Sequence, residues 1–157
     1  VEACEYKRDF LSLRPDILII TNLEFDHADY YTDLADVQAA FRTLAEQIND
    51  GGILVTDLKN PNLQPVVDGL DGKVVDYQDF FLLDLKLTQP GLHNRQNAAA
   101  AIAAARQEKI DLATCHTALG EFAGTWRRFE NKGEYRGAPV YDDYAHHPTE
   151  ITLAIAG

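Results

Sequence analysis

Ionisable side chains are concentrated in one short stretch, residues 141–150, which reads Tyr-Asp-Asp-Tyr-Ala-His-His-Pro-Thr-Glu. Two acids and two histidines fall within six residues, and a structural turn has little use for so many ionisable groups. The apolar run 138–141 is typical of a short strand, so these groups follow its carboxyl end. Because open α/β sheets place their ligand crevices at such ends, we predict a binding or catalytic site here.

A second cluster, residues 21–27, begins at the polar end of a continuous apolar run at 16–22. Asp26 and His27 stand just beyond the predicted strand, where they could hold a metal ion or a phosphate-linked water. Magnesium prefers oxygen ligands, and an imidazole suits manganese or zinc better. On spacing alone, a solvated loop with an ordinary surface histidine stays open as the alternative.

A third cluster, residues 91–97, lies at the start of an alanine-rich helix pattern. The helix N-terminus offers free amide groups and the positive end of the helix dipole. Asn94 and Asn97 are three residues apart and share a helix face, so they offer paired donors and acceptors suited to a purine edge. The alternative is that either asparagine simply caps the helix.

Two adjacent arginines, Arg127 and Arg128, follow Trp126 at a change in sequence character. Neighbouring residues of a strand point to opposite faces, so at most one arginine would face a given ligand. A solvated pair is the alternative. In an acidic chain, however, two arginines beside a domain junction are candidate phosphate contacts.

Strand and helix patterns alternate regularly, which predicts an α/β fold with a mainly parallel sheet flanked by helices. Buried strands are expected at 16–22 and 53–56, a third strand at 73–77, a helix at 34–48 begun by Asp33, and a short helix at 62–70. Further elements are expected at 80–87 (strand), 94–107 and 112–122 (helices, the second capped by Asp111 or Thr114), 127–135 and 138–141 (strands), and from Pro148 (helix).

The chain is expected to contain most of one domain, residues 1–124, and only the start of a second, residues 125–157. Residues 1–4 resemble the end of a strand without preceding elements, so we interpret the chain as part of a longer protein. The net charge of −11 over 157 residues argues against a nucleic-acid or anionic-membrane surface.

No signal peptide or membrane-spanning run is visible, and a soluble cytoplasmic protein is predicted. Cys4 and Cys115 fit no CxxC pattern and are predicted to be buried, reduced thiols.

Taken together, these clusters resemble the Mur ligase family, which builds the peptide stem of bacterial cell-wall precursors. The matching segments, in family order, are Glu2-Ala3-Cys4-Glu5 (usually Glu-Ala-Asp-Glu), 21–27 (Thr-Asn-x-x-x-Asp-His), 91–98 (Gly-x-His-Asn-x-x-Asn-Ala), 127–130 and 141–150. The resemblance covers essentially the whole chain. It implies a Mur ligase central, ATP-binding domain and the first strands of a Rossmann-like C-terminal domain.

The resemblance implies an ATP-dependent amide-forming ligase. ATP would convert the carboxylate of UDP-N-acetylmuramate to an acyl phosphate, which the amine of L-alanine then attacks, with two Mg²⁺ (or Mn²⁺) ions neutralising the phosphates. The form of residues 141–150 points to this reaction. Residues 23–29 lean instead toward members that add a murein peptide to the same sugar nucleotide. The double histidine argues against a folate-polyglutamating relative. A non-catalytic nucleotide-binding module and a zinc-binding structural domain stay open as further alternatives.

The residues that the resemblance implies are Glu2 and His27 for the metal; His93, Asn94, Asn97, Arg127, Arg128 and Asp143 for ATP; and His146 and Arg128 for catalysis. The asparagines would take the adenine with His93 beside it, Asp143 the ribose and the arginines the phosphates. His146 would lie near the reacting carboxylate or the amino acid.

Two departures from the family pattern are visible. Cys4 stands where an aspartate is usual, which removes a charge near the metal. The sequence also contains no Gly-x-x-Gly-Lys-Thr/Ser phosphate loop, which in the family precedes the Glu2 segment. We therefore expect this chain alone to lack ligase activity and to bind nucleotide weakly at best.

Overall fold

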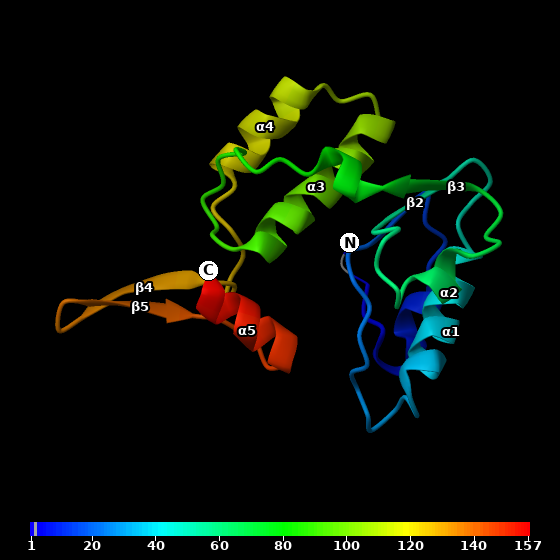
Figure 1. The fold of residues 1–157 in the computed structure, drawn as a ribbon, viewed down its shortest axis with the longest axis horizontal. Helices are drawn as coiled ribbons and strands as arrows, with labels where there is room; N and C mark the ends of the chain where they lie inside the picture. Colours follow the sequence, from blue (N-terminus) through cyan, green and yellow to red (C-terminus); the bar gives the residue numbers. More distant parts are fainter. Residues whose placement is uncertain (2) are drawn as a thin grey trace.

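A parallel sheet organises the first part of the chain (Figure 1). The computed structural model describes residue 1 and residues 3–157, and its parallel strands are β1 (Ile17–Ile20), β2 (Ile53–Thr56) and β3 (Lys73–Asp76), in the order β1-β2-β3. All four residues of β2 are buried, as expected for a central strand covered on both faces. The predicted α/β class with a parallel sheet is confirmed.

One face of the sheet is covered by α1 (Leu34–Ala45), together with the 3-10 helix η1 (Tyr6–Ser12) and the short α2 (Gln64–Val67). Asp33 caps α1 by accepting a 2.9 Å hydrogen bond from the Asp36 N–H, as its position before the apolar pattern predicted. The helix ends at Ala45, three residues before the predicted end. Leu18, Leu44 and Leu54 form part of the core between α1 and the sheet.

The opposite face is covered by α3 (Leu92–Gln107), whose alanines pack against Ile53, Val55 and Tyr77. Small side chains let the helix backbone approach the sheet closely. Beyond α3 lies α4 (Leu112–Glu121), which begins where Asp111 accepts a hydrogen bond from the Thr114 N–H. Of the two predicted caps of α4, Asp111 is therefore the correct one.

The predicted strand at residues 80–87 is wrong. The 3-10 helix η2 (Tyr77–Phe80) follows β3, and the chain then runs irregularly along α3. Arg95 of α3 donates hydrogen bonds to the carbonyl oxygens of Leu82 and Leu85, at 3.4 and 2.9 Å. Leu85 is buried in the cluster that contains α3, and most other apolar side chains of this segment pack partly buried against it, whereas Leu83 is exposed. Their hydrophobicity therefore reflects a helix contact instead of a sheet position.

The last part of the chain is a hairpin followed by a helix. β4 (Glu130–Tyr135) and β5 (Ala138–Asp142) pair antiparallel, and α5 (Pro148–Ala156) follows them. β4 begins at Glu130, not at the predicted residue 127, because Arg127 and Phe129 have left-handed φ angles of 55° and 50°. Figure 1 shows the hairpin projecting away from the parallel sheet, with α5 between the hairpin and the chain that follows β1.

The thiols differ in burial. Cys115 is buried in α4 but Cys4 is exposed, so the prediction of two buried thiols is wrong for Cys4; both are free cysteines. Residues 3 and 4 lie in no strand, contrary to the prediction for this end. No helix within the described ranges has the length and apolar character needed to cross a bilayer.

Candidate active site

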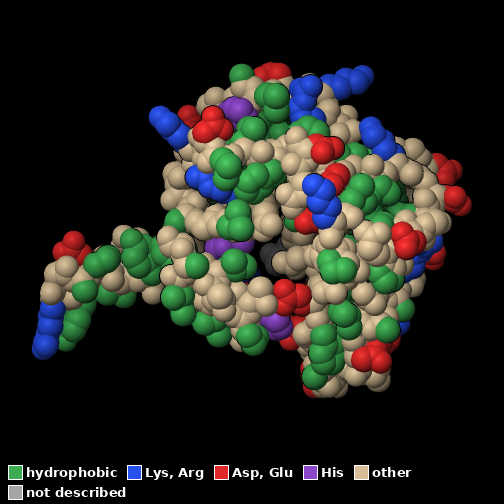
Figure 2. All heavy atoms as spheres, in the orientation of Figure 1, with side chains coloured by type: hydrophobic (Ala, Val, Ile, Leu, Met, Phe, Trp, Pro, Cys, Tyr) green, Lys and Arg blue, Asp and Glu red, His purple; other side chains and the backbone are tan. Residues whose placement is uncertain are grey.

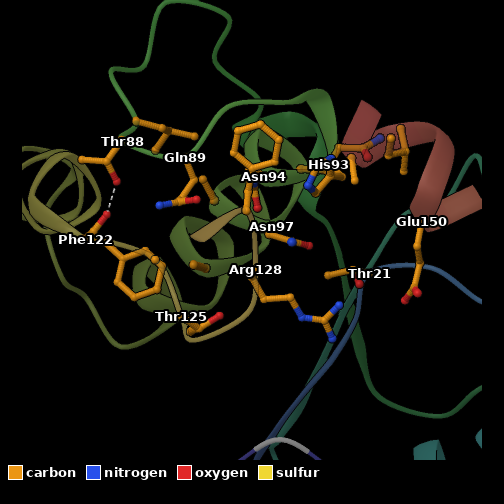
Figure 3. Close-up of a pocket in the computed structure, with 18 of the residues that line it drawn as sticks. Thr21, Thr88, Gln89, His93, Asn94, Asn97, Phe122, Thr125, Arg128 and Glu150 are labelled. Atoms are coloured by element: carbon orange, nitrogen blue, oxygen red, sulfur yellow. Dashed lines mark hydrogen bonds between the residues drawn. The ribbon is translucent and has the colours of Figure 1, made fainter. Parts of the chain in front are cut away.

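A cavity of about 730 Å³ lies where the start of α3 faces residues 122–129 and α5 (Figure 3). Its wall includes five of the six residues predicted to bind ATP: His93, Asn94, Asn97, Arg128 and Asp143. These residues come from two segments separated by about thirty positions in the chain. The fold therefore brings the predicted nucleotide residues to one place, with the exception of Arg127.

The α3 end of the cavity is shaped by Gly91, which occupies the N-cap with φ of 95°. A Cβ atom at this position would stand 2.6 Å from Cε1 of His93, so only glycine leaves room for the imidazole. Asn94 does not cap the helix; its Nδ2 donates to the Pro90 carbonyl oxygen at 2.6 Å. The alternative reading of the asparagines as helix caps is therefore wrong.

The two arginines point to different surroundings. Arg128 lines the cavity. Arg127 instead places its Nε 3.4 Å from Oδ2 of Asp142 and its guanidinium over the ring of Tyr144, at 4.9 Å. Only Arg128 of the pair lines the cavity. The expected reason, alternating faces of a strand, does not apply, because neither arginine lies in a strand and Arg127 has a left-handed φ of 55°.

Asp143 is held at the cavity wall by backbone hydrogen bonds. Its Oδ2 accepts from the Phe129 N–H at 2.8 Å and its Oδ1 from the Ala145 N–H at 2.7 Å. The N–H of Tyr144 also donates to the carbonyl oxygen of Arg127, at 2.8 Å. These bonds join the turn after β5 to the arginine segment, so the carboxylate and the Arg128 guanidinium are positioned together.

A second hollow, of about 370 Å³, lies next to the first and shares with it Thr21, Asn22, Glu150 and Leu153. It contains His27, whose Nε2 is 3.1 Å from Oε1 of Glu5. Figure 2 shows histidine and acidic side chains gathered around the opening between α5 and the sheet region. His27 is therefore separate from the nucleotide residues but adjoins their cavity.

The N-cap and first turn of α5 contact the loop after β1 across this second hollow. Thr149 Oγ1 donates to Oε2 of Glu24 at 2.8 Å, and Nδ1 of His147 lies 3.4 Å from the same oxygen. His147 also caps α5, where its Nδ1 accepts from the Thr149 N–H at 3.4 Å. His146, predicted to be catalytic, is largely exposed, with its Nε2 3.9 Å from Oδ2 of Asp26.

Glu150 lies between the two hollows and is kept ionised. Partial burial alone would raise the pKa of Glu150, but the N–H groups of His146 and His147 donate to its Oε2 at 3.1 and 3.3 Å. With the nearby charges of His146 and Arg128, these bonds lower the pKa of Glu150 below its usual value. The carboxylate also completes the capping box of α5.

Tyr77 supports the sheet side of the cavity. Its hydroxyl donates to the Thr21 carbonyl oxygen at 2.8 Å, and burial raises the pKa of Tyr77 to about 12. Sequence reasoning did not single out Tyr77, Glu24 or Thr149. The last two lie inside the quoted motifs, but nothing in their spacing indicated that the two motifs would touch.

The donors for a metal ion are few. Among residues 1 and 3–157, no group of three or more His, Cys, Asp or Glu side chains is arranged to hold a metal. Glu2, the other predicted ligand, lies outside the described residues. The Glu5–His27 pair offers one carboxylate and one imidazole, whereas magnesium favours several oxygen ligands. These two donors are too few to hold a metal ion on their own.

The sequence of this chain is similar to one family profile and to several known proteins. Residues 2–80 match the family profile described as the Mur ligase middle domain. The chain is 38% identical, over 99% of its length, to the UDP-N-acetylmuramate–L-alanine ligase of Salinibacter ruber, and 35% identical to that of Caldicellulosiruptor bescii, also over 99%. It spans 38% and 40% of these two relatives, about two fifths of their length.

Solved structures show the same similarity. The UDP-N-acetylmuramate–alanine ligase of Thermotoga maritima matches 95% of this chain and 39% of its own, with a TM-score of 0.72 and 29% identity. A murein peptide ligase from Psychrobacter arcticus matches 99% of this chain and 38% of its own, with a TM-score of 0.70 and 28% identity.

Proposed function

This chain belongs to the Mur ligase family, and we propose that it forms the nucleotide-binding centre of an ATP-dependent ligase that joins L-alanine to UDP-N-acetylmuramate. The observation that carries the proposal is the cavity that gathers His93, Asn94, Asn97, Arg128 and Asp143. The names of the relatives, which the chain matches over 99% of its length, support the choice of substrates.

The cavity lies between what we propose to be two domains, residues 1–124 and 125–157. The division is supported by the two separate sheets, one parallel and one antiparallel. Residues 122–129 connect them and line the cavity. Ligand sites commonly form at such junctions, because two surfaces can supply different contacts to one ligand.

ATP fits the size and the chemistry of this cavity. A volume of about 730 Å³ is within the usual range for small-molecule sites. In our proposal Asn94 and Asn97 contact the adenine with His93 beside it, Asp143 accepts hydrogen bonds from the ribose hydroxyls, and Arg128 contacts the phosphates. Because the chain has a net charge of −11, this arginine is needed to offset the overall field near the phosphates.

The acceptor side of the reaction would use the second hollow. The carboxylate of the sugar nucleotide would attack the γ-phosphate of ATP, giving an acyl phosphate and ADP, and the amine of L-alanine would then displace phosphate to form the amide. We propose that Arg128 offsets charge on the transferred group and that His146 lies near the reacting carboxylate or the amine. When bound, Mg²⁺ or Mn²⁺ would neutralise phosphate charge, with Glu2 and His27 as its proposed ligands.

Addition of a murein peptide in place of L-alanine is the second candidate. It is favoured by the segment 23–29, Leu-Glu-Phe-Asp-His-Ala-Asp, and by the similarity to the murein peptide ligase of Psychrobacter arcticus. Both candidates use ATP and the same sugar nucleotide, so they share the cavity described above. A cytoplasmic location is expected for either, since ATP is available there.

The arginine pair provides a matched test of the nucleotide site. In calorimetric titrations of the product of the complete open reading frame with ATP, Arg128→Gln is expected to weaken binding by roughly tenfold, the usual size of a lost charge-assisted hydrogen bond. Arg127→Gln, which makes the same chemical change next to the cavity, should change binding by less than about twofold. Equal effects of the two substitutions, or no ATP binding to the unsubstituted product of the complete open reading frame, would contradict the proposed site.

The reaction is tested on the product of the complete open reading frame that carries these residues. ADP release that requires both UDP-N-acetylmuramate and L-alanine would support the first candidate. Release that requires a murein peptide instead would support the second. ATP hydrolysis that is independent of the sugar nucleotide would contradict both.

A further inference from the structure

Two buried polar atoms at the cavity have no hydrogen-bond partner within the described part of the chain: Oε1 of Gln89 and Nδ1 of His93. A buried polar atom without a partner loses its hydrogen bonds to water and gains none in return, so such atoms are rare unless a ligand or water bonds to them. The resemblance to known enzymes had already indicated His93. Gln89 was not indicated by any motif.

The orientation of the Gln89 side chain is fixed by its neighbours. Nε2 of Gln89 donates to the Ala123 carbonyl oxygen at 2.9 Å. A carbonyl oxygen can only accept, so the amide nitrogen must face Ala123 and Oε1 must lie on the other side. Figure 3 shows the carboxamide with its nitrogen toward Phe122 and its oxygen toward the side where Asn97 lies.

The backbone around Gln89 makes this position rigid. Gly124 has φ of 89°, and a Cβ atom there would stand 2.7 Å from Cδ of Gln89, so the carboxamide occupies space that only a glycine leaves free. The neighbouring Thr88 hydroxyl donates to the Phe122 carbonyl oxygen, which ties the same segment to residues 122–124 (Figure 3). Gln89 therefore presents a fixed acceptor at the cavity wall.

Asn94 has the same polarity. Its Nδ2 is committed to the Pro90 carbonyl oxygen, which leaves its Oδ1 as an acceptor as well. Each anchored amide thus turns an acceptor oxygen away from its backbone partner, and the buried Oε1 of Gln89 is the one without a partner in the described part of the chain. An exocyclic amine, which carries two N–H donors, matches such a wall, whereas a carbonyl oxygen in the same place would be repelled.

We propose that Gln89 is a specificity-determining residue that selects adenine by accepting a hydrogen bond from its exocyclic amine. This inference rests on the proposed nucleotide site. A base with a 6-oxo group, such as hypoxanthine or guanine, presents an acceptor to Oε1 and leaves the buried oxygen unpaired. Discrimination by an unpaired buried group is larger than discrimination by shape alone.

The test compares ATP with inosine triphosphate, which differs at this position by an oxygen in place of the amine. Calorimetric titration of the product of the complete open reading frame should give an affinity for ATP about tenfold above that for inosine triphosphate, as expected for one hydrogen bond to a buried group. Gln89→Met keeps the length of the side chain and removes the acceptor, so the two affinities should become equal within about twofold.

A matched control is Gln96→Met, because Gln96 also borders the cavity but has no buried atom without a partner. This variant should keep the preference of the unsubstituted chain. A measurement without mutation guards against a folding defect in Gln89→Met: the side-chain amide resonances of Gln89, followed by ¹⁵N NMR, should shift with ATP and much less with inosine triphosphate.

The outcomes separate the inference from the proposed function. If ATP binds but Gln89→Met keeps the full preference, or the Gln89 resonances respond equally to both nucleotides, the inference is overturned and the nucleotide site stands. If neither nucleotide binds the product of the complete open reading frame, both are overturned. Loss of the preference in Gln89→Met together with its retention in Gln96→Met would support the inference.

Discussion

The parallel-sheet region and the hairpin–α5 region are held together by different forces. In the sheet region, β2 is completely buried and clusters of buried apolar side chains cover both faces. In contrast, none of residues 121–157 is buried. The second region is positioned by polar contacts, among them Asp143 with the Phe129 N–H and Thr149 with Glu24. The cavity therefore has one wall fixed by packing and one wall fixed by hydrogen bonds.

The largest difference is expected from substituting one apolar strand residue in each region. Leu54 is fully buried in β2, and Leu54→Ala should lower the free energy of unfolding by about 2–5 kcal/mol through lost burial and a residual cavity. Val140 of β5 is 39% exposed, and Val140→Ala should change the free energy of unfolding by less than about 0.5 kcal/mol. Urea unfolding followed by circular dichroism measures both. Similar losses would mean that the hairpin has a core of its own.

An alkaline effect of intermediate size is expected from Tyr77. Its pKa is raised from 10.0 to about 12, chiefly by burial and further by Asp57 and Asp76. The unfolded chain loses this proton first, so the stabilising contribution is complete below pH 10.0 and falls as the pH rises through about 12. Tyr77→Phe should remove this part of the pH dependence and, at neutral pH, cost about 1 kcal/mol for the lost hydrogen bond to Thr21.

Tyr144, which is 52% exposed in the second region, provides the control for this prediction. Urea titrations at neutral and alkaline pH should show the same alkaline loss in Tyr144→Phe as in the unsubstituted chain. If Tyr144→Phe and Tyr77→Phe reduce the alkaline loss equally, burial in the sheet region is not its cause.

A smaller effect is expected from the contact between Thr149 and Glu24. Thr149→Val and Glu24→Gln should each weaken the hold of α5 on the loop after β1, with a coupling energy of about 0.5–1 kcal/mol in a double-mutant cycle. Amide hydrogen exchange within α5 measures this. Thr152→Val is the control, because the Thr152 hydroxyl bonds only to the Pro148 carbonyl oxygen of its own helix. Additive effects of the first two substitutions would show that the contact does not couple the regions.

The smallest effect is expected at acid pH, where Glu150 loses its contribution to the stability of α5. Because its pKa is lowered in the folded chain, its contribution to α5 is present above the usual value of 4.5 and is lost as the pH falls through the lowered value. Exposure to solvent limits this contribution to a few tenths of a kcal/mol. NMR chemical shifts of α5 should show helix fraying at acid pH, and Glu150→Gln should make the fraying independent of pH in this range. Fraying that persists in the variant would assign the effect to another group.

The same contrast explains what could be predicted from the sequence. Strands β1, β2 and β3 were predicted from short apolar runs, although β2 is buried at every position whereas β1 exposes Ile19 and β3 has no buried residue. Asp33 and Asp111 were predicted because a helix cap depends on residues close in the sequence. The strand predicted at 80–87 is wrong because the same apolar run can pack in a sheet or against the surface of an alanine-rich helix, and the run alone does not show which. Arg95, which holds that segment in its irregular path, lies beyond it in the sequence.

The site shows the same limit. Asn94, Asn97, Arg128 and Asp143 were identified because motifs carry them, but their meeting in one cavity depends on the polar contacts that position the second region. The separation of Arg127 from Arg128 depends on a left-handed φ that no residue type there favours. Gln89 was missed because its importance comes from a missing hydrogen bond, and a sequence does not show which polar atoms are left without a partner.

One atom in the turn after β5 has two incompatible partners. Nδ1 of His147 accepts the Thr149 N–H at the start of α5, and it also lies 3.4 Å from a carboxylate oxygen of Glu24. To accept, this nitrogen must keep its lone pair; to donate to the carboxylate, it must carry a proton. The imidazole tautomer of His147 therefore determines whether Nδ1 accepts from the Thr149 N–H at the start of α5 or donates to Glu24 in the loop after β1. The position of one proton selects between a contact inside the turn and a contact between segments far apart in the sequence.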